Sequence, residues 1–240
     1  MTNPTAAMLV IGDEILSGRT RDSNMHYLAQ ELTKHGIDLI EARMVADDAE
    51  GIIDAVQTLS ARVDHLFTSG GIGPTHDDIT ADCIAAAFET PIDVRDDARA
   101  LLAAHYAQSG KELNEARLRM ARIPDGASLI DNPVSIAPGF TLRNVHVMAG
   151  VPTIFETMVA SVLPTLSGGA PVLSQSLRLE RGEGEIAAPL GKLAERYPAL
   201  SFGSYPFQNN GIHGTNIVIR GQDGGALDAA MTDLAAMVAQ

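Results

Sequence analysis

The chain has 240 residues, 45% of them hydrophobic and 20% charged, which allows one large globular domain or one domain with a small appendage. The 17 Lys and Arg residues against 30 Asp and Glu give a net charge of −13, which disfavours nucleic acid and an anionic membrane surface as partners. The single cysteine, Cys83, excludes an internal disulfide and a cysteine-based zinc site. The sequence shows no export signal and no apolar run of the roughly 20 residues that span a bilayer, so we expect a cytoplasmic protein.

Short apolar runs alternate with helical patterns in the first part of the chain. Ala6–Ile11 is a continuous apolar run ended by Gly12, which is typical of a strand buried on both faces of a parallel sheet. Ile37–Val45 and His65–Thr68 predict two more strands. The intervening helices are expected after caps at Asp22 or Ser23, after caps at Asp47 or Asp48, and in the segment that carries Ile79, Cys83, Ile84 and Ala87. This alternation predicts βαβ units and an open parallel sheet with helices on both sides.

The next segment has shorter elements. Residues 95–122 show a polar helical pattern, and Asn, Pro and Gly then separate three short strands at Ser128–Ile130, Phe140–Leu142 and Val145–Met148. A helix is predicted over Thr153–Leu166. We therefore expect an α/β fold in which two helical layers enclose a mostly parallel sheet.

A linker and a change of pattern follow. The segment Ser167-Gly168-Gly169-Ala170-Pro171 is the clearest linker signal in the chain. The remaining elements predict a small βαββα unit of about 70 residues, a size at which a domain can fold alone but is marginal. We predict two domains, residues 1–168 and an α+β appendage over residues 169–240.

Three loops leave the carboxyl ends of the predicted strands, where open parallel sheets bind their ligands. The first runs from Gly12 to Gly18 and carries Asp13 and Glu14, and the second carries Asp47. The third is glycine-rich, and its ligand-binding candidates are Ser69, Gly70, Gly71, Gly73, Pro74 and Thr75.

The third loop is the most informative. Its three glycines let the backbone approach a ligand, and its amides precede a helix start that favours an anion. Pro74 is expected to stiffen the turn and Thr75 to cap the helix, which places Asp77 and Asp78 in the first helical turn. A tight strand-to-helix turn without a ligand explains the glycines equally well.

The acidic side chains next to this loop point to a metal. Carboxylates repel a phosphate, and a divalent cation with hard oxygen ligands resolves the conflict. We therefore predict Mg²⁺ or Mn²⁺ held by Asp13, Asp77 and Asp78, with Asp13, Glu14, Asp47 and Asp78 as the catalytic candidates. Arg19 and Arg21 offer further charge neutralisation, although a solvated helix start explains them better.

Two later loops add weaker ligand candidates. The loop from Asn132 to Gly139 is a second ligand loop or only a rigid connection, and Gly150-Val151-Pro152 again places amides before a helix. Their ligand-binding candidates are Ala137, Pro138, Gly139, Gly150 and Pro152.

These motifs resemble a known family. The stretch Gly12-Asp13-Glu14-Ile15-Leu16-Ser17-Gly18 and the later Gly70-Gly71-Ile72-Gly73-Pro74-Thr75-His76-Asp77-Asp78 are similar to the molybdopterin-binding (MoaB/Mog) domain. Ala137-Pro138-Gly139-Phe140 and Gly150-Val151-Pro152 resemble the branch in the N-terminal half of competence/damage-inducible protein A (CinA), which includes the domain fused to eukaryotic FAD synthases. The resemblance covers about residues 6–166, and the tail, with Gly203-Ser204-Tyr205-Pro206, resembles the small domain that follows in CinA.

The resemblance implies a three-layer α/β/α fold and a pocket at the strand ends. In Mog-type relatives this pocket binds molybdopterin, which is adenylylated there. In the CinA-type branch the similar domain is associated with divalent-metal hydrolysis of a nucleotide pyrophosphate such as ADP-ribose, and its relatives with FAD. The positions carried over are Asp13, Glu14, Asp47, Asp78, Gly70, Gly71 and Gly73. Ser135-Ile136 replaces the Gly-Thr often found in CinA-like sequences, and the deamidase half of CinA is not expected in this chain.

Three functions remain open at this point. The first is metal-dependent hydrolysis of a nucleotide pyrophosphate of the ADP-ribose or FAD type. The second is molybdopterin binding or adenylylation in molybdenum cofactor biosynthesis, and the third is a non-catalytic nucleotide- or pterin-binding module. All three have a small-molecule nucleotide or pterin ligand, and the oligomeric relatives imply a homo-oligomer.

Overall fold

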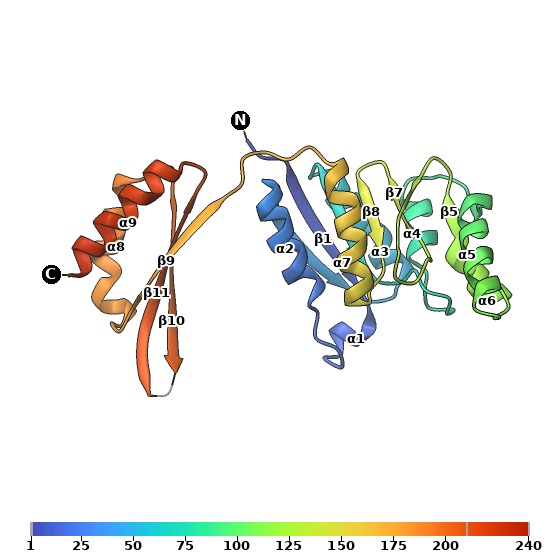
Figure 1. Cartoon of the computed structure of the whole chain (residues 1–240), viewed down its shortest axis with the longest axis horizontal. Helices are drawn as coiled ribbons and strands as arrows, with labels where there is room; N and C mark the ends of the chain where they lie inside the picture. Colours follow the sequence, from blue (N-terminus) through green and yellow to red (C-terminus); the bar gives the residue numbers. More distant parts are fainter. Residues whose placement is uncertain (1, 210, 240) are drawn as a thin grey trace. The chain divides into compact units, whose positions relative to one another are not determined.

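The computed structural model describes residues 2–209 and 211–239. These residues form two compact units, the first ending at Gly169 and the second beginning at Ala170 (Figure 1).

The first unit is built on a six-stranded sheet. Its strand order is β2 (Asp38–Val45), β1 (Thr5–Ile11), β3 (His65–Ser69), β8 (Val145–Met148), β7 (Gly139–Leu142) and β6 (Ser128–Ile130). The first four strands run parallel, whereas β7 is antiparallel to both of its neighbours. The expected mostly parallel sheet is confirmed, with a short antiparallel meander at one edge.

Helices cover both faces of this sheet, as predicted (Figure 1). In β1, Leu9 faces the layer of α3 (Ala49–Ser60) and α4 (Thr80–Ala87), while Met8 faces the layer of α2 (Asn24–His35) and α7 (Pro152–Val162). Both side chains are fully buried, because β1 lies between two helical layers. This position explains the continuous apolar run of β1, since a strand covered on both faces has no solvated side.

Two of the predicted capping side chains form hydrogen bonds at the starts of their helices. The Asp22 carboxylate accepts hydrogen bonds from the backbone N–H groups of Asn24 and Met25, both at 3.2 Å. The Asp48 carboxylate accepts one from the Gly51 N–H at 2.9 Å. Each carboxylate satisfies N–H groups that have no partner within the helix.

The prediction of one helical segment over residues 95–122 was wrong in part. The structure has α5 (Asp96–Gln108), α6 (Glu115–Leu118) and the 3₁₀ helix η1 (Arg119–Ala121), bracketed by the antiparallel strands β4 (Ile92–Val94) and β5 (Arg122–Pro124). Gly110 has a φ of +65°, and the Asn114 side chain accepts the Arg117 N–H to start a new helix. Strands of three residues are too short to produce a periodic signal.

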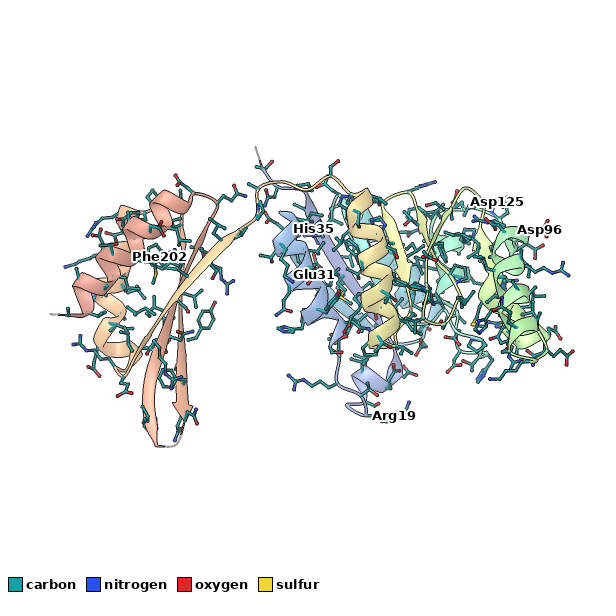
Figure 2. The ribbon with its side chains drawn as sticks, viewed as in Figure 1. Arg19, Glu31, His35, Asp96, Asp125 and Phe202 are labelled. Carbon is teal, nitrogen blue, oxygen red and sulfur yellow. The ribbon has the colours of Figure 1, made fainter. Side chains whose placement is uncertain are left out.

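The second unit is a three-stranded antiparallel sheet with two helices. Its elements are β9 (Leu173–Leu179), α8 (Glu183–Arg196), β10 (Ser201–Asn209), β11 (Ile212–Gly221) and α9 (Gly224–Val238), and β11 is the central strand. Ile217 and Ile219 of β11 pack with Leu190 of α8 and Leu234 of α9. Phe202 packs against the same cluster (Figure 2). The predicted βαββα order is confirmed.

Two expectations from composition can be compared with the structure. Cys83 lies on the buried face of α4, and burial raises the pKa of its thiol to about 11, so it is an unreactive core residue. Among the described residues, we find no helix that combines the length and the apolarity required to cross a membrane.

A buried histidine lies at the centre of the first unit. His146 of β8 is 3% exposed, its Nε2 lies 3.3 Å from Nδ1 of His65, and its Nδ1 lies 3.0 Å from Oγ1 of Thr141. Its ring contacts that of Phe67 at a centroid distance of 4.8 Å. Burial, assisted by the charge of His65, lowers the pKa of His146 to about 3. The imidazole therefore stays neutral in the folded state at ordinary pH.

We expect the first unit to lose stability in mild acid because of His146. The pKa falls from an ordinary value of 6.5 to about 3 on folding, so between these values the unfolded chain takes up a proton that the folded chain refuses. Above pH 6.5 the contribution of His146 to the free energy of unfolding does not change with pH. At pH 5 the loss is at most about 2 kcal/mol, which is 1.5 pH units at about 1.36 kcal/mol each.

Hydrogen exchange of peptides from β3 and β8 at pH 7.5 and pH 5, corrected for the intrinsic exchange rate, measures this loss. His146→Gln keeps a side chain that donates and accepts but cannot be protonated. The variant is expected to be less stable at pH 7.5 and to show a shallower dependence on pH. Equal pH dependence in the two proteins would show that His146 is not responsible.

Candidate functional site

The carboxyl ends of β1, β2, β3 and β8 surround a cavity of about 530 Å³. This volume is in the range of small-molecule binding pockets. The backbone of the third loop forms one wall, through Gly70, Gly71, Ile72 and Gly73. The start of α7, at Gly150, forms another. The sheet topology therefore brings the predicted loops to one pocket.

The glycines of the third loop are required by close packing. Gly70 and Gly71 have φ values of +111° and +68°, which disfavour any residue with a side chain. A Cβ atom at Gly70 would collide with the carbonyl oxygen of Ile11, and one at Gly71 with Oγ1 of Thr80. The Gly70 N–H donates to the Met148 carbonyl at 3.1 Å, so this amide is used to join the loop to β8.

The third loop ends differently from the sequence prediction. Helix α4 begins at Thr80, so Thr75, Asp77 and Asp78 precede the helix instead of forming its cap and first turn. The Asp78 carboxylate accepts from both the N–H and the hydroxyl of Thr75, at 2.8 and 2.6 Å. This pair folds the loop into a turn of its own and delays the helix. The Thr80 hydroxyl donates to the Gly70 carbonyl at 3.0 Å and closes the base of the loop.

Four carboxylates from three loops line the cavity: Glu14 of α1 (Asp13–Leu16), Asp47, Asp77 and Asp78. Oδ2 of Asp47 accepts the N–H of Asp13 at 3.0 Å. Burial raises the pKa of the Asp47 carboxyl, this hydrogen bond opposes the rise, and the charges of Asp13, Glu14 and Asp77 add to it. Among the described residues, no Lys or Arg lines this cavity. The wall of the pocket is therefore rich in carboxylates. Arg119, which lines an adjoining cavity, donates to the backbone carbonyl of Asp78 at 3.2 Å.

The other candidates divide into those that line the cavity and those that do not. Pro74, Ala137, Gly150 and Pro152 line it. Ser69 and Pro138 line smaller neighbouring cavities. Asp13, Thr75 and Gly139 are not among the described lining residues, and Asp13 contributes its backbone N–H instead of its carboxylate. Gly139 is required by the sheet, because a Cβ there would collide with the carbonyl oxygen of Val147.

The two arginines proposed as neutralising groups also lie outside the cavity lining. Arg19 is exposed beside α1 (Figure 2). Arg21 lines a smaller neighbouring cavity. Exposure to solvent in the segment ahead of α2 is therefore enough to explain Arg19.

The sequence prediction missed a buried polar residue beside the pocket. The Nδ2 group of Asn24 donates to Oγ of Ser69 at 2.7 Å and to the Gly150 carbonyl at 2.8 Å, so it ties α2 to two of the pocket loops. A carbonyl can only accept, which fixes the orientation of the amide. Oδ1 of Asn24 is buried without a hydrogen-bond partner among the described residues and borders a small cavity next to the main one. The sequence offered only the Asp-Ser-Asn pattern of a helix start.

Three apolar side chains of the pocket also had no signal in the sequence. Ile72, Met120 and Ile154 line the cavity from the third loop, from η1 and from α7. They add apolar surface to a cavity that the carboxylates also line, which suits a ligand with a charged end and a flat ring.

The donor set fits a divalent cation that is shared with a ligand. Within the part of the chain that the structure describes, no group of three or more His, Cys, Asp or Glu side chains is placed to hold a metal ion, so a cation here would need oxygens of the ligand as well. Mg²⁺ is commonly bound by one or two carboxylates and completes its shell with waters and substrate phosphates. Burial raises the pKa of the Asp47 carboxyl and the charges of Glu14 and Asp77 add to the rise, so these carboxylates lie near enough to one another to share such a cation with a ligand.

Comparison with known proteins identifies the first unit. Residues 7–168 match the model of the probable molybdopterin-binding domain. The chain belongs to this family. The molybdopterin-binding domain is followed by a segment, residues 171–240, that matches the middle domain of FAD synthase. Both parts of the resemblance stated from the sequence are thereby confirmed.

Named relatives cover both units. A probable FAD synthase of Caenorhabditis elegans is 31% identical over an alignment of 260 positions that covers 98% of this chain and 50% of that protein. A CinA-like protein of Citrifermentans bemidjiense is 37% identical over 79% of this chain and 45% of its own length. The chain thus spans about half the length of these two relatives. The crystal structure of the protein CinA from Thermoplasma acidophilum matches with a TM-score of 0.63 and 30% identity, over 69% of this chain and 99% of that one.

Membership in the molybdopterin-binding domain family indicates a small-molecule ligand. The cavity of about 530 Å³ at the strand ends is the described feature that suits one.

Proposed function

We propose that the first unit hydrolyses a nucleotide pyrophosphate, of the ADP-ribose or FAD type, with the help of Mg²⁺ or Mn²⁺. One observation supports this proposal above others: four carboxylates and a glycine-rich backbone face one cavity that no described Lys or Arg lines. An anionic ligand is repelled by such a wall unless a cation lies between them. A diphosphate that arrives with a divalent cation satisfies this requirement.

The residues of the pocket have separable roles in this proposal. One or two of the carboxylates of Glu14, Asp77 and Asp78 would hold the cation together with oxygens of the ligand, and the bound cation would lower the pKa of a water and neutralise phosphate charge. The backbone of Gly71–Gly73 and Gly150 orients the diphosphate. Asp47 accepts the proton of the attacking water, because its raised pKa and its hydrogen bond from Asp13 give a fixed base of increased basicity. Attack of the water oxygen on one phosphorus breaks its bond to the bridging oxygen, which leaves with the other phosphate. The products are AMP and the second phosphate monoester, ribose 5-phosphate from ADP-ribose or FMN from FAD.

A second function is favoured by the family itself. The pocket would instead bind molybdopterin, and the pterin would be adenylylated there. The apolar surface of Ile72, Met120 and Ile154 accommodates a pterin as well as a nucleobase. A third possibility, a pocket that binds either ligand without turnover, uses the same surfaces. We rank a nucleotide pyrophosphate first as the ligand because the similarity to the probable FAD synthase, whose named product contains a pyrophosphate, extends over both units.

The deciding experiment measures AMP release from ADP-ribose and from FAD by the full chain, with Mg²⁺, with Mn²⁺ and with a chelator. We expect release only with a metal, and a loss of about 100-fold or more in Glu14→Gln. Glu50→Gln, an exposed acid on α3, is the matched control and should keep full activity. Molybdopterin binding without AMP release supports the second function. Nucleotide binding that survives chelation, without turnover, supports the third.

A further inference from the structure

A small side cavity of about 50 Å³ adjoins the main pocket. The two cavities share part of their walls, including Ile11, Glu14 and Gly150, and the side cavity is also lined by Asn24 and Ser69. Its volume is far below the several hundred cubic ångströms that enclose a whole ligand, but it has room for groups of the size of a hydroxyl or a water. The side cavity is therefore suited to a single substituent of a ligand in the main pocket.

Two buried polar side chains of the side cavity are joined to each other. Asn24 at the start of α2 is 4% exposed, and Ser69 at the end of β3 is 2% exposed. Nδ2 of Asn24 donates to Oγ of Ser69 and to the Gly150 carbonyl. Both amide hydrogens are thus used, so the plane of the Asn24 amide is fixed before a ligand arrives.

Each of these two side chains has hydrogen-bonding capacity left. Oδ1 of Asn24 has no partner among the described residues and remains a free acceptor. The Ser69 oxygen accepts from Asn24, and within the described part of the chain its own hydrogen has no acceptor. Because buried polar groups without partners are costly, the pair is suited to a ligand group that supplies both missing bonds.

A neutral hydroxyl supplies both bonds. It donates its hydrogen to Oδ1 of Asn24 and accepts the hydrogen of Ser69. An ionised phosphate only accepts, and it is disfavoured because the side cavity has the carboxylates of Glu14 and Asp22 against one exposed arginine, Arg21. The exocyclic amino group of a base donates but does not accept from Ser69.

The other buried polar atoms without a partner among the described residues do not offer a comparable site. Arg119 and Arg122 each have an unpartnered Nε, but their guanidinium groups already bind the Asp78 carbonyl and the Asp82 carboxylate. The cavity that these arginines line, of about 20 Å³, has room for one water. Thr68 is not among the described lining residues of the main pocket or of the side cavity.

We propose that Asn24 and Ser69 bind a ribose hydroxyl of the nucleotide that occupies the main pocket. ADP-ribose, FAD and AMP all contain an adenosine ribose with two free hydroxyls, so one recognition site serves each of them. Asn24 and Ser69 then select a ribonucleotide over a deoxyribonucleotide. This inference rests on the proposed function only in so far as a nucleotide binds in the pocket, and it does not require hydrolysis.

Isothermal titration calorimetry of the full chain with AMP, 2′-deoxy-AMP and 3′-deoxy-AMP, each with Mg²⁺, tests the proposal. AMP is expected to bind about tenfold or more tightly than one of the two analogues, because that analogue leaves buried polar groups unpaired. In Ser69→Ala the affinity for AMP should fall while the affinity for that analogue stays nearly the same. Ser109→Ala, at an exposed serine that follows α5, is the matched control and should keep the wild-type ratio of affinities.

Asn24→Ala removes the free acceptor together with the bonds to Ser69 and Gly150, so its fold is checked by circular dichroism. The folded variant should bind AMP and the analogues equally, whereas a merely structural role of Asn24 would weaken all three alike and keep their ratio.

Equal affinity of the wild type for the three nucleotides, which is the result expected if only a water fills the side cavity, would overturn the proposal. An unchanged ratio in Ser69→Ala, or no nucleotide binding at all, would overturn it as well. A wild type that prefers AMP over one analogue but releases no AMP from ADP-ribose or FAD would contradict only the proposed hydrolysis.

Discussion

Gly70→Ala is expected to destabilise the first unit by about 3 kcal/mol or more and to abolish ligand binding. The new methyl group would collide with the Ile11 carbonyl oxygen, which belongs to β1 and cannot move without disturbing the centre of the sheet. The φ of +111° adds backbone strain for any residue with a Cβ. The free energy of unfolding, measured by hydrogen exchange in β1 and β3, reports this loss.

Gly126→Ala separates the collision from the strain. Gly126 has a φ of +79°, but no atom lies within 4 Å of the position that a Cβ would occupy. Only the strain applies, and a cost of about 1–2 kcal/mol is expected. If both variants lost the same stability, the contact between the glycine loop and β1 would contribute nothing, contrary to the structure.

Asp47→Asn is expected to make the protein slightly more stable at pH 7 and at least about 100-fold slower in AMP release. The pKa of Asp47 is higher in the folded than in the unfolded chain, so its ionisation costs stability once the pH rises above the ordinary value of 3.8. The amide of Asn removes this charge but still accepts the Asp13 N–H. Because the side chain is only partly buried, we expect a gain of a few tenths of a kcal/mol. A loss of stability in exchange for activity is common in sites that hold like charges close together.

Unfolding in urea at pH 7 and at pH 3, with AMP release measured in parallel, checks both effects. The difference in stability between wild type and Asp47→Asn should shrink toward pH 3, where both carry a neutral side chain. Asp54→Asn, an exposed acid on α3, is the control for a general change in net charge. If Asp47→Asn were less stable than the wild type and fully active, Asp47 would not be the general base and its ionisation would not lower the stability.

Local interactions explain which elements of the fold could be predicted from the sequence. The apolar run of β1 and the acidic caps Asp22 and Asp48 act over a few residues, and their patterns predicted the elements that they form. The start of α4 depends on a turn closed by Asp78 and Thr75, which competes with helix formation over the same residues. Propensity patterns do not decide such a competition.

The residues of the candidate site, too, could be predicted only in part from the sequence. The acids and glycines of three loops could be predicted to meet, because the carboxyl ends of parallel strands share one edge. Met120 reaches the cavity from a 3₁₀ helix some fifty positions along the chain from the third loop, and Asn24 joins α2 to Gly150, 126 residues away. Contacts at such separations leave no periodic trace in the sequence.

Short-range patterning, composition and motifs were enough to predict the strand and helix alternation, the acidic character of the loops and the family resemblance, because each depends on residues close together in the chain. Tertiary packing was needed to show that Asp13 donates its backbone N–H to Asp47, that burial raises the pKa of the Asp47 carboxyl, and that a Cβ at Gly70 would collide with β1. These properties depend on which segments pack together in space, and burial, collision and charge repulsion exist only once they do.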